Sequence, residues 1–87
     1  MAYSVLLVED DEQIREVITD YFAAKDGVIS VETAADGDKG MELIHNNEYD
    51  LILLDVMLPG TDGFSLCRYI RAESSVPTVS YTHLTLP

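Results

Sequence analysis

The stretch SVLLVEDDE at positions 4–12 decides the fold that we predict for this chain. An apolar run at positions 4–8 stops abruptly at four consecutive acidic residues. A run of this kind is typical of a strand that is buried on both faces of a parallel sheet. A second apolar run, DLILLD at positions 50–55, also ends on a carboxylate, Asp55. The two runs therefore predict two buried strands whose carboxyl ends carry acidic side chains.

The segments around these runs alternate between helix and strand patterns. Apolar residues at helical spacing predict a first helix that begins after Asp11, its N-cap, and stops at Gly27. We also predict strands over 28–34 and 76–81, a turn over 35–37, a short helix ending near 46–47, a loop over 56–63 and a helix over 64–72. Strict alternation of strand and helix predicts an α/β fold, a doubly wound parallel sheet with right-handed crossovers.

Composition narrows the classes of function. A chain of 87 residues is enough for one small domain. Its formal charge of −11 argues against direct binding to nucleic acid or to an anionic membrane, since both need clusters of basic residues. The start of the chain has neither the basic segment nor the apolar length of a signal peptide or a membrane span, so we expect a cytoplasmic protein.

Two further residue types have simple predicted roles. The single cysteine, Cys67, excludes an internal disulfide and a cysteine-based metal site, and we expect it to be a small core residue. We predict that the basic residues are solvated surface charges: Arg15, Lys25, Lys39, Arg68 and Arg71.

The acidic residues at the strand ends predict a binding site. In doubly wound sheets, ligands bind outside the carboxyl ends of the strands, where the winding reverses. If the second strand lies outside the first, Glu9 and Asp10 face Asp55 across neighbouring strands. Carboxylates crowded in this way repel one another, and a hard divalent cation such as Mg²⁺ compensates the charge. Helix capping explains Asp11 and Glu12 equally well, but it does not explain Asp55, which opens a loop.

The segments LLVEDDEQIR (6–15) and LILLDVMLPGTDGF (51–64), with the Val-Pro pair at 76–77, resemble the receiver domain of bacterial two-component response regulators. The likeness runs over residues 3 to about 79 in order and spacing. It implies a flavodoxin-like sheet of order 2-1-3-4. It also implies that Asp55 is the phosphoacceptor and that Asp10 is a direct Mg²⁺ ligand. Glu9 would assist, and the backbone carbonyl of Met57 would be the remaining protein ligand.

The resemblance also implies partners. The phosphoryl donor of the family is a phosphohistidine on a sensor histidine kinase, or a small acyl phosphate, and the receiver passes its signal to an effector domain. On this interpretation the chain is a signalling phosphoacceptor and not an enzyme acting on external substrates.

The end of the chain departs from the family pattern. The family's switch uses a hydroxyl residue after the fourth strand and a lysine after the fifth, and by register from the Val-Pro pair Thr82 falls at the hydroxyl position. However, the ending TVSYTHLTLP (78–87) is too polar for a buried central strand. We therefore predict an incomplete receiver domain over residues 3–79, lacking strand 5 and helices 4 and 5, and a tail over residues 80–87 that is not native sequence.

The same residues argue against two other functions and leave a third open. Phosphatases of the haloacid-dehalogenase type carry the motif Asp-x-Asp-x-Thr after an apolar strand. In this chain Met57 occupies the position of the second Asp, so the general acid of those enzymes is missing. A calcium loop counted from Asp36 fails, because Gly40 and Asn47 occupy its fifth and twelfth positions. A module with the receiver shape that binds partners without switching stays open as an alternative.

Overall fold

The computed structural model describes residues 3–24, 27–55, 63–73 and 75–81. Its elements follow one another as β1 (Tyr3–Val8), α1 (Glu12–Ala23), β2 (Ile29–Ala34), α2 (Gly37–Asn46), β3 (Leu51–Asp55), α3 (Gly63–Glu73) and β4 (Thr78–Tyr81). All pairings are parallel, and the strand order is β2-β1-β3-β4. The predicted fold class and the order 2-1-3-4 are confirmed.

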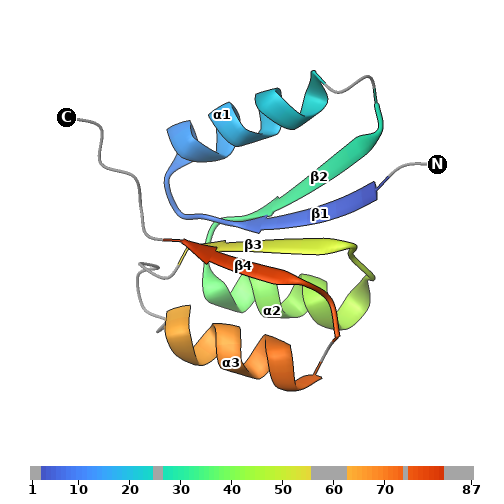
Figure 1. Cartoon of the computed structure of the whole chain (residues 1–87). Coiled ribbons are helices and arrows are strands. Elements are labelled where there is room, and N and C mark those ends of the chain that lie inside the picture. Colours follow the sequence, from blue (N-terminus) through green and yellow to red (C-terminus); the bar gives the residue numbers. More distant parts are fainter. Residues whose placement is uncertain (1–2, 25–26, 56–62, 74, 82–87) are drawn as a thin grey trace.

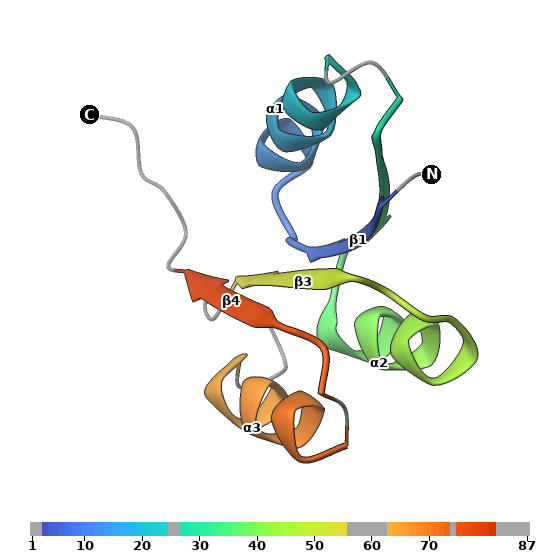
Figure 2. The same cartoon turned by 45° about the vertical axis from the view of Figure 1, so that its right-hand side comes forward.

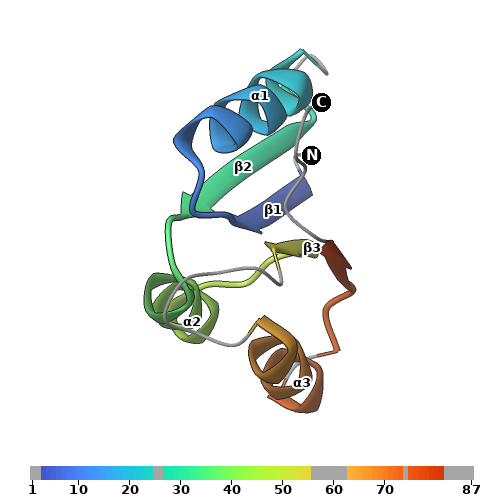
Figure 3. The same ribbon diagram turned by 90° about the vertical axis from the view of Figure 1, so that its left-hand side faces the viewer.

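Helices cover the two faces of the sheet unequally. Figure 1 shows α1 on one side of the sheet and α2 and α3 on the other, and the turned views in Figures 2 and 3 agree. Helix α1 packs on β2, α2 on β1 and β2, and α3 on β3 and β4. Because the strands are parallel, their carboxyl ends share one edge of the sheet, at the left in Figure 1.

The core lies mainly on the face covered by α2 and α3. Successive strand side chains point to opposite faces, so Leu6 and Val8 face this side together with Ile52 and Leu54. Among its described side chains, helix α3 adds those of Leu66, Cys67 and Ile70 to the core. The core role predicted for Cys67 is confirmed, because the residue is 4% exposed.

The face covered by α1 is more open. Val17 and Tyr21 on this helix are 68% and 61% exposed. A hollow lies between the helix and the sheet, where Leu53 and Tyr81 reach its floor. The alternation of side chains along each strand explains why Leu53 and Tyr81 share this face. Leu53 pairs with Val79 and Asp55 with Tyr81, and paired residues point to the same face of the sheet.

Helix ends follow local chemistry, with one correction. Asp11 is the N-cap of α1, as predicted, and its carboxylate accepts hydrogen bonds from the backbone N–H groups of Gln13 and Ile14. The prediction that Gly27 stops this helix is wrong. The helix ends at Ala23, and Gly27, with φ of 74°, instead lies in the turn that leads into β2.

Candidate functional site

Three carboxylates meet where β1 and β3 end. The side-chain oxygens of Glu9, Asp10 and Asp55, called the acid cluster below, include a set that lies within 4.8 Å of one another. Glu9 and Asp55 are fully buried, whereas Asp10 is exposed. Because β1 and β3 are neighbours, residues 46 positions apart in sequence share one site. The juxtaposition predicted from the two apolar runs is confirmed.

The connection between β1 and α1 is tightly hydrogen-bonded. The Glu9 N–H donates to the carbonyl of Ala34 at 2.9 Å, which extends the ladder between β1 and β2 by one bond. The Asp11 N–H in turn donates to Glu9 Oε2 at 3.1 Å. The carboxylate of Glu9 is thus held by the backbone of the segment that carries it.

The prediction that Arg15 is a solvated surface charge is wrong. Its Nη1 donates to the backbone carbonyls of Glu9 and Asp10, both at 2.9 Å, and the residue is half-buried. Arg71 also has a backbone partner, since its Nη2 donates to the carbonyl of Thr78 at 3.1 Å. Lys39 and Arg68 fit the prediction, because both are exposed. Lys25 lies outside the described residues.

Tyr81 contacts the acid cluster, and the sequence analysis did not predict this contact. Its hydroxyl donates to Glu9 Oε1 at 2.9 Å, across the end of β3. Tyr81 pairs with Asp55 in the register of β3 and β4, and the alternation of side chains along the strands places both on the face covered by α1. The contact depends on this register, which lets a long side chain at position 81 reach over Asp55 toward β1, and the sequence alone carries no signal for it.

Burial dominates the electrostatics of the cluster. It raises the pKa of Glu9 above its ordinary value of 4.5, although hydrogen bonds from Asp11 and Tyr81 oppose the shift, and the Asp55 carboxylate adds to it. Burial and the acceptor Glu9 raise the pKa of Tyr81, which therefore stays a neutral donor. Three converging carboxylates, two of them buried, form the oxygen donor set that a hard divalent cation prefers.

Two predicted site residues, Met57 and Thr82, lie outside the described residues. Among the residues that the structure describes, the acid cluster is the group of three or more His, Cys, Asp or Glu side chains placed to share an ion.

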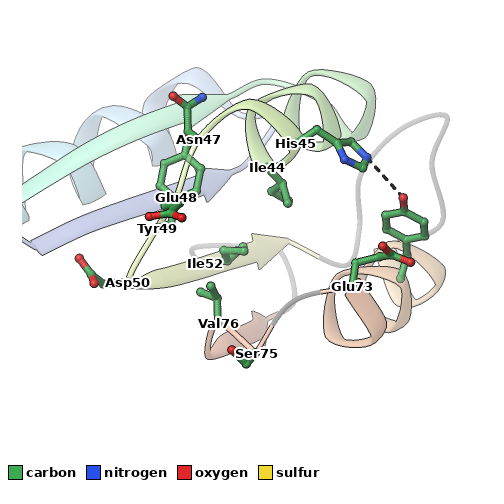
Figure 4. Close-up of a pocket in the computed structure, with 11 residues that line it drawn as sticks. Ile44, His45, Asn47, Glu48, Tyr49, Asp50, Ile52, Glu73, Ser75 and Val76 are labelled. Carbon is green, nitrogen blue, oxygen red and sulfur yellow. Dashed lines mark hydrogen bonds between the residues drawn. The ribbon is translucent and has the colours of Figure 1, made fainter.

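A separate hollow of about 680 Å³ opens at the other end of the sheet (Figure 4). Asp50 and Val76, which line it, precede β3 and β4, so it lies at the amino ends of the strands. His45 lines it as well, and its Nε2 lies 3.3 Å from the hydroxyl of Tyr69. The hollow contains no member of the acid cluster.

Comparison with known proteins decides the family. The family model of the response regulator receiver domain matches residues 5–85. The chain belongs to this family. The receiver domain is 51% identical over 75 residues to the transcriptional regulatory protein CseB of Streptomyces avermitilis, an alignment that covers 86% of this chain and 31% of CseB. It is 42% identical over 81 residues to RstA of Escherichia coli, covering 93% of this chain and 33% of RstA.

Solved structures agree with the fold of the receiver domain. The BeF₃-activated receiver domain of RstA from Klebsiella pneumoniae superposes with a TM-score of 0.84 at 37% identity, covering 95% of this chain and 69% of that structure. TrrA of Thermotoga maritima, solved in complex with Mg²⁺ and BeF, gives a TM-score of 0.79 at 25% identity, covering 92% of this chain and 66% of TrrA.

The receiver domain spans about a third of the length of the curated relatives that it matches. Those relatives are transcriptional regulators, and so belong to signalling proteins rather than to metabolic enzymes. In the part of the chain that the structure describes, no helix has the length and apolar character needed to cross a membrane.

Proposed function

We propose that this receiver domain accepts a phosphoryl group on Asp55 with the help of Mg²⁺ held at the acid cluster. The observation that carries the proposal is the convergence of Glu9, Asp10 and Asp55 within 4.8 Å at the carboxyl ends of β1 and β3. Asp10 is exposed and suits direct contact with the cation. Each oxygen of Glu9 already accepts a hydrogen bond, one from Asp11 and one from Tyr81, which favours contact with the cation through water.

The chemistry of the transfer follows from the residues. A carboxylate oxygen of Asp55 forms a bond to phosphorus while the P–N bond of a phosphohistidine, or the P–O bond of an acyl phosphate, breaks. The leaving group keeps the electron pair of the broken bond, and a leaving imidazole takes up a proton. A bound Mg²⁺ supplies charge neutralisation for the phosphoryl oxygens. The buried position of Asp55 at the end of β3 limits the directions from which it can attack.

Intact-mass spectrometry tests the proposal. The 87-residue chain is incubated with Mg²⁺ and a small acyl phosphate, beside the variants Asp55→Asn and Asp38→Asn. Asp38 is an exposed acid on α2, so its variant controls for the loss of one charge. We expect one added phosphate on the parent and on Asp38→Asn, and none on Asp55→Asn. An unmodified parent would favour the alternative, a module that binds partners without switching.

The cellular setting is part of the same proposal. We propose a sensor histidine kinase as the donor, an effector domain as the recipient of the signal, and the cytoplasm as the location. The relatives CseB and RstA support an effector that regulates transcription. The domain boundary at residue 79 and the non-native tail over residues 80–87 stay predictions. Recovery of the source gene with one native reading frame through residue 87 would contradict the prediction that the tail is not native.

A further inference from the structure

Arg15 makes a contact that the function proposed above does not use. It lies near the start of α1, four residues after the N-cap Asp11, whose carbonyl accepts its backbone N–H at 3.0 Å. Its side chain turns back along the helix toward β1. There a single nitrogen, Nη1, donates to two consecutive carbonyls, those of Glu9 and Asp10. These are the two residues of the segment that contribute carboxylates to the acid cluster.

The place of these carbonyls in the sheet explains what the contact does. In an extended strand, the N–H and the C=O of one residue point to the same side. The Glu9 N–H points to β2, because it donates to the carbonyl of Ala34, so the Glu9 carbonyl also points to that side. Strand β2 ends at Ala34, and Arg15 supplies a donor where the ladder stops.

The second bond of Arg15 extends the constraint by one residue. The carbonyls of Glu9 and Asp10 belong to the two peptide groups on either side of the Asp10 Cα, and Nη1 of one planar guanidinium donates to both at 2.9 Å. Their shared donor limits rotation of the backbone on either side of the Asp10 Cα. The direction of the Asp10 side chain, which is exposed and has no core around it, depends on that backbone.

We infer that Arg15 is a positioning residue of the acid cluster, holding the backbone of Glu9 and Asp10 so that both carboxylates face Asp55. This inference rests on the proposed function, since its purpose is to prepare the cluster for Mg²⁺. Arg15 acts through the backbone and touches neither the cation nor the phosphoryl group.

The charge of Arg15 and its positioning role have opposite effects on Mg²⁺ affinity. A cation beside the site repels Mg²⁺, so loss of the guanidinium charge alone would tighten Mg²⁺ binding. Loss of the two hydrogen bonds frees the segment and weakens binding. The direction of the change in Kd therefore separates the two roles.

The experiment is a Mg²⁺ titration of the 87-residue chain followed by NMR chemical shifts, with three variants. Arg15→Met keeps the length of the side chain but removes its charge and donors. Arg15→Lys keeps a charge and a donor. Arg68→Met removes the same charge from an exposed position on α3 and is the control. We expect Kd to rise about tenfold in Arg15→Met, the lower end of effects for groups that orient metal ligands. Arg15→Lys should restore most of the loss, and Arg68→Met should leave Kd at the parent value.

A second measurement needs no metal. Amide hydrogen exchange of the metal-free chain should become several-fold faster at Glu9 in Arg15→Met. Exchange at Ile52, whose N–H donates to the carbonyl of Pro77, should not change. A uniform increase at both amides would mean a general loss of stability and would overturn the positioning role.

The two measurements distinguish a failure of the proposed function from a failure of the positioning role of Arg15. If the parent does not bind Mg²⁺, the proposed function fails, and exchange at Glu9 still decides whether Arg15 holds the segment. If the parent binds Mg²⁺ but Arg15→Met binds it equally well or more tightly, the positioning role is overturned and the proposed function stands.

Discussion

The acid cluster should destabilise the metal-free fold, and Asp55→Asn should relieve part of that cost. Two unit charges 4.8 Å apart, the spacing within which the cluster oxygens lie, repel by about 3.5 kcal/mol at an effective dielectric constant of about 20. The net effect is smaller, because Asp10 is exposed and screened by solvent, and because the raised pKa of Glu9 lowers its charge. We therefore expect Asp55→Asn to raise the free energy of unfolding by roughly 1–2 kcal/mol without metal.

Magnesium should narrow that difference. A cation bound to the folded parent at ten times its Kd adds about 1.4 kcal/mol to the free energy of unfolding, and the variant should lose most of this gain. Urea unfolding followed by circular dichroism, with EDTA and then with Mg²⁺, measures both effects. Asp20→Asn, an exposed acid on α1, is the matched control for the change in net charge.

Two results would refute this reasoning. A metal-free Asp55→Asn that is no more stable than Asp20→Asn would show that crowding of carboxylates is not costly here. Equal stabilisation of the parent and Asp55→Asn by Mg²⁺ would place the cation somewhere other than the acid cluster.

Three further changes test the fold and the cluster. Burial raises the pKa of Glu9, so the folded state binds this proton more tightly than the unfolded chain, and stability falls as pH rises from 4.5 through the raised value. Metal-free Glu9→Gln should therefore be more stable than the parent at neutral pH, and this advantage should disappear as pH falls through the raised pKa toward 4.5. Parallel pH curves of the urea midpoints of the two proteins would contradict this. Gly40→Ala should destabilise the fold by about 1 kcal/mol in urea, because the new Cβ would lie 3.0 Å from Cγ2 of the buried Val8, and this clash should exceed the gain in helix propensity. An unchanged or higher midpoint would show that Val8 can move aside. Asp11→Ala should cost about 1 kcal/mol, since two N–H groups at the start of α1 lose their acceptor, and thermal unfolding of the two chains should differ by several degrees.

Several features could be predicted because they depend on local chemistry or on simple periodicity. The apolar runs before Glu9 and Asp55 predict buried strands, and the confirmed N-cap at Asp11 needs only a carboxylate next to a helix start. The meeting of Glu9, Asp10 and Asp55 required one more assumption, that β2 lies outside β1, and the strand order bears this out.

Other features depend on the register and reach of particular side chains. The error at Gly27 arose because a glycine predicts a stop without saying how many residues before it the helix ends. The sequence position of Arg15 predicts a surface charge, because it does not reveal that two backbone carbonyls lie within reach of the side chain.

The amino-acid sequence by itself determined the α/β fold, the receiver family and the carboxylates at the ends of β1 and β3, because each follows from periodicity, spacing or motif. The tertiary structure decided which other groups contact those carboxylates. Tyr81 reaches Glu9 only because the register of β4 against β3 points it over Asp55. Arg15 reaches the carbonyls of Glu9 and Asp10 only because α1 starts directly beside the end of β1. Both contacts arise from side-chain length and backbone direction in three dimensions, which residue spacing along the chain does not encode.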